Sequence, residues 1–273
     1  MTTRTCRLPV RAAVWLHLAI VVLILPAPLD AHHEAIFGPQ STTLVSHRRF
    51  VSTQYYFINE GRAPAARQHS HVPVLTVSTA LGDRWSVSAS LPVEAERGGH
   101  ERVTGVHDPV IGFRYFPEAG PNRVFITALT IEPPASNLEH RALGTGAGVV
   151  YGAERGHWSG IVYGLGRTEF SFDEGEKRGN RLFLGGGLAY ETEPLPFSPQ
   201  IGLSWERVAR RREHDAIEEE SNTSVLMIHP TLVKTFRQER LQAFLVLSLP
   251  AGQWSGHEGW QRFRVAAGLL WTF

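Results

Sequence analysis

Apolar and polar residues alternate along most of the chain after about residue 44, and clusters of Gly, Pro, Asn and Asp interrupt the alternation. A period of two is typical of β-strands with one apolar face. No segment keeps a helical period over three turns, and the charged run 207–220 comes nearest to one. The final segment shows the strand pattern most clearly, because one face carries Phe263, Val265, Ala267, Leu269, Trp271 and Phe273. The pattern therefore predicts an all-β protein.

The alternation predicts about twelve strands. Most are about ten residues long, which is the length that a tilted strand needs to cross a bilayer core of about 30 Å. An even number of such strands is typical of a transmembrane antiparallel β-barrel, in which closure pairs every backbone polar group. The expected strands are 44–58, 71–81, 84–96, 106–116, 123–132, 142–153, 157–170, 181–191, 199–208, 224–236, 240–250 and 260–273.

The lengths of the connections support a barrel of the bacterial outer membrane. Such barrels have short periplasmic turns and longer outer loops. If the first strand starts on the periplasmic side, the periplasmic connections are short except for 192–198, which is proline-rich and of moderate length. The outer ones are mostly longer and more polar: 59–70, 97–105, 133–141, 171–180, 209–223 and 251–259. The chain ends on Phe273, the terminal aromatic that the barrel assembly machinery reads. A secreted β-sandwich is the alternative, but it explains neither the loop order nor this ending.

The N-terminal segment has the layout of a secretory signal peptide. Arg4, Arg7 and Arg11 precede the apolar run 12–25, and small Ala31 follows two prolines. An uncleaved membrane anchor is the alternative. We expect a signal peptide over 1–31, a periplasmic N-terminal segment over 32–43 and the barrel over 44–273.

Composition narrows the function classes. The formal net charge of +1 over 273 residues excludes a strongly basic nucleic-acid binder. Removal of residues 1–31 takes away three of 27 basic and one of 26 acidic side chains, leaving 24 against 25. Cys6, the one cysteine, leaves with them, so neither disulfides nor a thiolate metal site is expected.

Parity along the strands predicts which charged side chains face the lumen. Two interpretations stay open: the charges form a polar path for a solute, or they pair across a narrow barrel and fill it. Gly144, Gly146, Gly148, Gly185 and Gly187 either leave room for a solute or bend the strands. The predicted lumen residues are Arg84, Glu94, Asp108, Arg114, Arg181, Glu206, Arg262 and Arg264.

Histidines are the second set of candidates. His69 and His71 are two residues apart and so point to the same side of a strand, where they are candidates for a shared copper or zinc ion. His32 and His33 are at the expected new N-terminus and are similar candidates with the free amine. Neither pair has a third ligand nearby in the sequence.

The sequence carries no enzyme motif and no signature of a resident cofactor, although a membrane hydrolase with a Ser–His pair on the outer wall stays open as a third function class. It contains no G-x-S-x-G turn, no H-E-x-x-H motif and no phosphate-binding glycine loop. The charged run 207–220 contains Arg210, Arg211 and Arg212, and it is interpreted as a solvated outer loop whose arginines contact lipopolysaccharide phosphates. Aromatic residues near strand ends fit the girdles at the two membrane interfaces.

Three segments resemble a family of outer-membrane proteins named for the MetA pathway of phenol degradation. The segment 105–115, GVHDPVIGFRY, resembles that family's G-x-x-D-x-x-x-G-x-[KR]-Y strand, and 128–134 resembles its next strand, although Glu132-Pro133-Pro134 departs from the usual turn. His229-Pro230-Thr231 and Leu247-Ser248-Leu249-Pro250 are similar to its penultimate hairpin. The resemblance implies a β-barrel and a channel or transport role for small, including aromatic, molecules.

The sequence thus favours a narrow outer-membrane channel for small solutes, of aromatic or hydrophobic type. The alternative is a metal-binding outer-membrane or secreted β protein without pore activity. The expected partners are outer-membrane lipid, lipopolysaccharide, the barrel assembly machinery and a small-molecule solute, with no nucleic acid.

Overall fold

The computed structural model describes residues 48–60, 68–98, 101–106, 108–117, 122–134, 142–171, 176–177, 180–190, 197–209, 211–213, 216–218, 223–236, 240–255 and 261–273. The expected signal peptide and N-terminal segment, with His32 and His33, lie outside these residues. The described part contains strands and turns, and none of it forms a helix long and apolar enough to cross a membrane.

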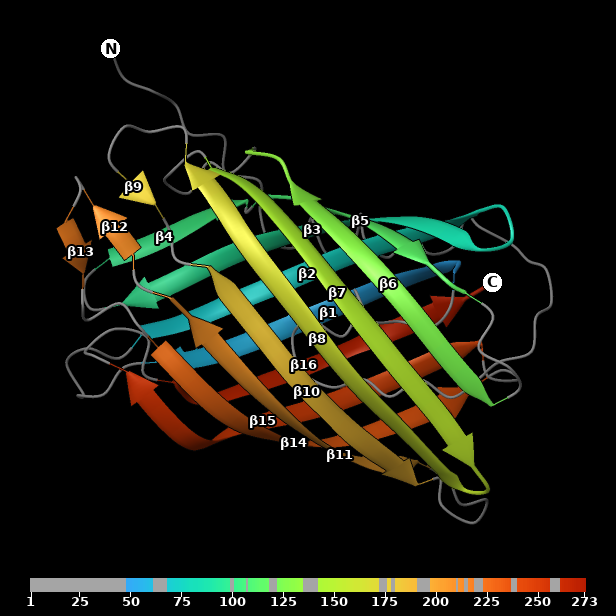
Figure 1. Cartoon of the computed structure of the whole chain (residues 1–273). Coiled ribbons are helices and arrows are strands. Elements are labelled where there is room, and N and C mark those ends of the chain that lie inside the picture. The colour runs from blue at the N-terminus through green and yellow to red at the C-terminus, as the bar shows by residue number, and fades with distance from the viewer. Residues whose placement is uncertain are drawn as a thin grey trace.

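The strands close into one barrel (Figure 1). Apart from one strand that is divided into two pieces, each wall strand pairs antiparallel with the wall strands next to it in the chain, so the sheet is an up-and-down meander. Its members are β1 (Phe50–Glu60), β2 (Gln68–Leu81), β3 (Trp85–Gly98), β4 (Glu101–Val106), β5 (Val110–Tyr115), β6 (Arg123–Glu132), β7 (Ala142–Arg155), β8 (Trp158–Ser171), β10 (Arg181–Tyr190), β11 (Ser198–Val208), β14 (Thr223–Phe236), β15 (Leu241–Ser255) and β16 (Gln261–Thr272).

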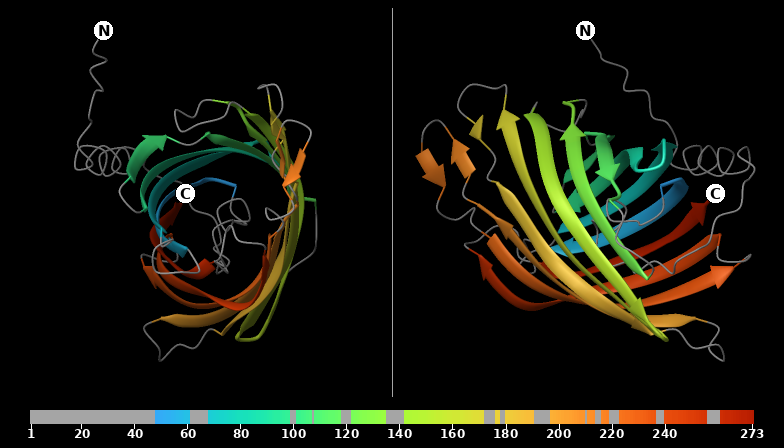
Figure 2. Two further views of the ribbon diagram at one scale, coloured as in Figure 1. Left: turned by 90° about the vertical axis from the view of Figure 1, so that its left-hand side faces the viewer. Right: turned by 45° about the vertical axis from the view of Figure 1, so that its right-hand side comes forward.

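The first and last strands complete the ring. β1 pairs with β16 from Phe50↔Thr272 to Asn59↔Phe263, and the register shifts at Glu60, which pairs with Gln261. The view along the barrel shows the wall returning on itself (Figure 2, left). Closure pairs the edges that an open sheet would leave exposed in the bilayer.

Side chains alternate between the two faces of the wall, as the period of two predicts. Large apolar side chains such as Leu129 (57% exposed), Val162 (58%) and Leu203 (52%) lie on the outside. Their neighbours along the strands, among them Ala128 and Tyr163, are buried on the inside. The outer face is thus an apolar band suited to lipid.

The all-β barrel of about twelve strands predicted from the sequence is confirmed. The main difference concerns the fourth strand, which consists of two pieces, β4 and β5. Pro109 lies between them and has no N–H to donate to a ladder. β5 pairs with the first half of β3, whereas β4, which the sequence analysis placed in a loop, pairs with the second half, up to Gly98↔Glu101.

Three short strands lie beyond the outer end of the barrel. β9 (Glu176–Lys177), β12 (Arg211–Glu213) and β13 (Ala216–Glu218) form a small separate sheet (Figure 1). They fall within the connections predicted as outer loops at 171–180 and 209–223. The long connections therefore carry some regular structure.

At the opposite end of the barrel, the described connections between β2 and β3 and between β7 and β8 are tight turns. Gly82 (φ 71°), Gly156 (φ 61°) and Asn122 (φ 60°) adopt the left-handed conformation that such turns require. Two aromatic pairs, Trp85–Tyr115 and Trp158–Tyr190, have ring centroids 4.7 Å apart at this end. Both tryptophans are exposed, as expected for a girdle at the membrane interface.

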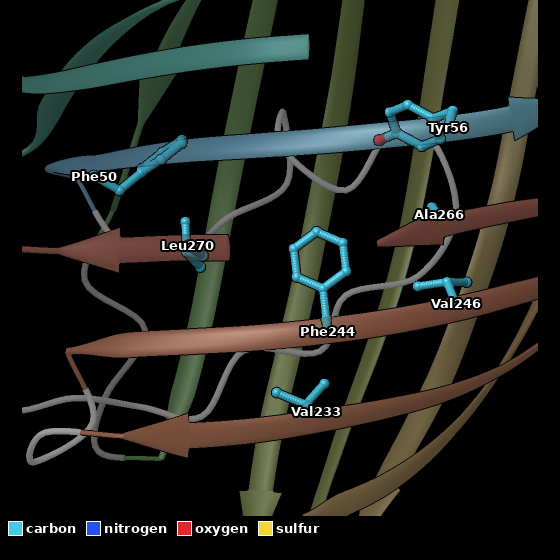
Figure 3. Packing of buried hydrophobic residues seen from close by; sticks show 7 residues of the cluster. All are labelled: Phe50, Tyr56, Val233, Phe244, Val246, Ala266 and Leu270. Carbon is cyan, nitrogen blue, oxygen red and sulfur yellow. The ribbon is translucent and has the colours of Figure 1, made fainter. Parts of the chain in front are cut away.

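A buried apolar cluster lines one side of the interior, from the inner end to the middle of the barrel. Its side chains come from β1, β14, β15 and β16 and point into the barrel (Figure 3). The members are Phe50, Tyr56, Val233, Phe244, Val246, Ala266 and Leu270. A smaller cluster on β6, β7 and β8 consists of Ile126, Val150 and Tyr163.

We predict that Gly268→Ala destabilises the β1–β16 seam by about 1–3 kcal/mol, the usual cost of overpacking. A Cβ at Gly268 would lie 2.5 Å from the Thr53 carbonyl oxygen and 2.6 Å from Phe244 Cζ. The measurement is the unfolding free energy of the purified barrel in urea. Gly166→Ala is the control, because the nearest atom to a Cβ there is 4.0 Å away. Equal stability of the two variants would contradict the prediction.

Candidate lumen site

A chain of polar side chains crosses the interior wall at one level. His229 of β14 is fully buried, with Nε2 2.7 Å from the Ser204 Oγ of β11 and Nδ1 2.8 Å from the Ser248 Oγ of β15. Tyr163 of β8 hydrogen-bonds to Ser204, and Arg264 of β16 is the register partner of Ser248. We call Tyr163, Ser204, His229, Ser248 and Arg264 the polar half-ring.

A glycine makes the first link of the half-ring possible. Gly185 of β10 lies in register between Tyr163 and Ser204. A Cβ at Gly185 would lie 2.5 Å from the Tyr163 hydroxyl oxygen. Since β10 has no side chain at this position, the phenol of Tyr163 crosses over it and reaches Ser204 on the next strand.

An ion pair crosses the lumen side of the half-ring. Arg264 Nη2 lies 3.3 Å from Glu206 Oε2, and both side chains are largely buried, at 10% and 16% exposed. β14 and β15 lie between the strands that carry them, so the two side chains reach over the inner face of these strands. Arg264 Nε is buried and has no hydrogen-bond partner among the described residues.

A second arginine is buried near the inner end. Arg114 is 0% exposed, and its Nη2 donates a hydrogen bond to the Ser78 Oγ at 2.6 Å. Its guanidinium carbon also lies 5.1 Å from the centroid of the Phe50 ring and 5.6 Å from that of Phe116. These contacts place a cation between aromatic faces, an arrangement that stabilises a charge away from bulk water.

A third charged group lies near the outer end. Arg167 of β8 forms an ion pair with Glu132 of β6, and Glu132 is buried. Arg181, half-buried, is the register partner of Arg167 on β10. Arg114 thus lies near the inner end of its strand, whereas Arg264 and Arg167 lie nearer the outer ends of theirs.

The remaining predicted lumen residues have different placements. Glu94 and Asp108 are half-buried, on β3 and between β4 and β5. Arg84 is exposed in the turn before β3, because that strand begins one residue later than predicted. Arg262 is also exposed and has no register partner on β1, because the ladder shifts there. The structure brings together Arg264 and Glu206 from the predicted set.

His69 and His71 lie on the outer surface of the wall rather than in the lumen. Both rings pack against Phe57, with centroid distances of 5.7 Å and 5.2 Å. Among the described residues, no group of three or more His, Cys, Asp or Glu side chains is placed to hold a metal ion. The geometry therefore favours an aromatic surface patch over a metal site.

The predicted lumen glycines make room for neighbouring side chains. A Cβ at Gly144 would lie 3.0 Å from the Cβ of Glu132, and one at Gly146 would lie 2.4 Å from the Thr130 Oγ1. At these positions, as at Gly185, the space beside the glycine is occupied by a side chain from an adjacent strand. These glycines therefore make room for side chains of adjacent strands, which differs from both the open path and the strand bending considered above.

Four half-ring residues were not identified from the sequence as site residues: Tyr163, Ser204, His229 and Ser248. Parity alone places all four on inward faces. The missing information is the register between strands, which sets which side chains meet. The one local signal was His229 directly after the apolar run 225–228.

Solved structures with the same architecture are outer-membrane barrels. The COG4313 outer membrane channel from Pseudomonas putida F1 aligns with a TM-score of 0.70 and 13% identity, over 91% of this chain and 100% of that one. The β domain of the Bordetella autotransporter BrkA aligns with a TM-score of 0.55 and 12% identity, over 83% and 100%. The NanC porin aligns with a TM-score of 0.51 and 9% identity, over 82% and 100%.

No protein-family model matches this sequence, and no curated protein sequence matches it. The structural likeness therefore concerns the fold. A closed barrel with an apolar outer band and short turns at the end where the chain terminates belongs to the bacterial outer membrane.

We predict that His229→Leu lowers the unfolding free energy by about 1–3 kcal/mol, because Ser248 then has a buried hydroxyl without its imidazole partner. Urea unfolding of the purified barrel measures the change. His157→Leu, at an exposed turn position, is the control and should change stability by less than about 0.5 kcal/mol. Adding Ser248→Ala to His229→Leu should recover part of the loss, and no recovery would contradict the assigned pairing.

Proposed function

We propose that the protein is a narrow outer-membrane channel for small solutes that have an apolar body and one polar group. The observation that carries this proposal is the placement of the apolar cluster directly beside the polar half-ring on the same strands. Val246 and Ala266 of the cluster are each two residues from Ser248 and Arg264 of the half-ring. A solute at this level has apolar and hydrogen-bonding contacts within reach at the same time.

The size of the barrel supports a narrow path. Twelve strands enclose much less space than the 16–18 strands of general porins. Side chains reach inward from several levels, and the Arg264–Glu206 pair crosses two strands. Passage of a small solute is compatible with this interior if contacts are favourable enough for entry and weak enough for release.

The apolar character of the wall supports aromatic or hydrophobic solutes over sugars. Phe244, Tyr56 and Phe50 are buried aromatic side chains on the inner face of β15 and β1. Flat apolar molecules gain contact area against aromatic side chains. This solute class also agrees with the resemblance of segments 105–115 and 128–134 to the phenol-degradation family. We propose that the protein is related to that family.

Further proposals concern the rest of the chain and its surroundings. We propose that residues 1–31 are a signal peptide and that 32–43 remain in the periplasm. The assembly machinery is proposed to recognise the final strand, whose last residue, Phe273, is half-buried. Arginines of the 207–220 connection are proposed to bind lipopolysaccharide phosphates, with which a guanidinium forms two parallel hydrogen bonds.

The proposal is tested by conductance of the protein in planar bilayers. We expect discrete channel steps that benzyl alcohol, a small apolar solute with one hydroxyl, reduces in a concentration-dependent way. A folded, heat-modifiable barrel that never conducts would contradict the channel.

We predict that Val246→Thr raises the half-blocking concentration of benzyl alcohol several-fold, because a hydroxyl replaces a methyl group in the apolar cluster at nearly constant volume. Val246 is 1% exposed on the inner face. Val149→Thr makes the same change on the outer face, where Val149 is 49% exposed, and should leave the block unchanged. The same effect from both variants would show that the block does not occur in the lumen.

A further inference from the structure

Arg264 has a guanidinium edge that is only half used. Nε and Nη2 form the side edge of an arginine, which binds a carboxylate through two parallel hydrogen bonds. Glu206 contacts this edge through Nη2 alone, at 3.3 Å, which is long for a charge-assisted bond. Nε is buried and has no partner among the described residues, in a side chain that is only 10% exposed.

The surroundings of this edge suit a carboxylate that belongs to a small apolar molecule. One carboxylate, that of Glu206, already lies against Arg264 at this position. Ser248, in register with Arg264, adds a hydroxyl at the same level. Ala266 and Val246, which are register partners, are buried apolar side chains immediately beside it.

We propose that Arg264 is the recognition site for the carboxylate of a small apolar monocarboxylate, such as an aromatic acid, and that this carboxylate takes the place of Glu206. The inference rests on the channel proposed above and names its solute class. The solute carboxylate binds Nε and Nη2 side-on, and its apolar body packs on Val246, Ala266 and Phe244.

Glu206 acts as an internal competitor in this arrangement. It neutralises the arginine when no solute is bound, so the buried cation is never left unpaired. It also lowers the net affinity, because each solute must displace it, and weak binding is what a transport path needs. The Arg264–Glu206 ion pair spans the inner face of β14 and β15. When the solute replaces Glu206, this ion pair no longer crosses the lumen.

The experiment measures binding of benzoate and benzyl alcohol to the folded protein by calorimetry in detergent. The two probes have the same ring and differ in the carboxylate. We expect benzoate to bind more tightly than benzyl alcohol. Arg264→Gln should lower the affinity for benzoate at least tenfold and change the affinity for benzyl alcohol by less than twofold. Glu206→Gln should raise the affinity for benzoate several-fold, because the charged competitor is gone.

Two further variants separate recognition from general effects. Arg264→Lys keeps the charge without the two-pronged edge, and its benzoate affinity should fall between those of the wild type and Arg264→Gln. Arg167→Gln breaks another luminal Arg–Glu pair, with Glu132, and should change the affinity for benzoate by less than twofold. Heat-modifiability confirms that each variant is folded.

Several results would overturn the inference. These are equal affinity for benzoate and benzyl alcohol, an unchanged benzoate affinity in Arg264→Gln, and an equal loss in Arg167→Gln. Inorganic phosphate, which has no apolar body, should bind more weakly than benzoate, and phosphate binding as tight as benzoate would also overturn the assignment.

Parallel bilayer recordings distinguish this failure from failure of the channel. A protein that conducts but does not prefer benzoate is a channel without this carboxylate site. A protein that prefers benzoate through Arg264 but never conducts retains the site and loses the proposed channel.

Discussion

The rest of this structure depends on one requirement: a backbone inside a bilayer has no water to bind its N–H and C=O groups. The chain meets it by pairing its wall strands around a closed ring, including β1 with β16. Once the wall is closed and its strands alternate, each side chain has two destinations, lipid or lumen. All chemistry available to a solute is therefore confined to one residue in two along the strands.

The interior that results is amphipathic rather than uniformly polar. Buried serines, an imidazole and arginines lie among phenylalanines, valines and leucines on the same strands. A buried polar group is costly unless it has a partner, and here partners come from strands distant in sequence, as when His229 joins Ser204 and Ser248. Such a network fixes side chains in one arrangement, so the polar half-ring presents a defined surface instead of a mobile lining.

The sequence was sufficient to predict the barrel fold and the face of the wall on which many side chains lie. Both follow from the period of two and from the lengths of the connections. Of the residues that parity predicts to face the lumen, Arg114 and Arg264 are buried and Glu206 is largely buried. The sequence was not sufficient for contacts between strands. Glu206 and Arg264 are 58 residues apart, and only the register of the intervening strands brings them together. Gly185 shows the same limit, since its role depends on a tyrosine of another strand. The assignment of 97–105 to a loop was wrong because β4 pairs beyond the break at Pro109.

The pairing of β1 with β16 also has a consequence for the order of events during biogenesis. Phe50 finds its partner Thr272 only after the whole chain exists, so the seam joins the earliest and latest parts of the wall to be synthesised. Contacts so distant in sequence form slowly, because a long loop must close before they contribute any stabilisation. Until then both outermost strands expose unpaired edges, which other chains readily pair with. These two edges are therefore protected from pairing with other chains only when β1 and β16 meet.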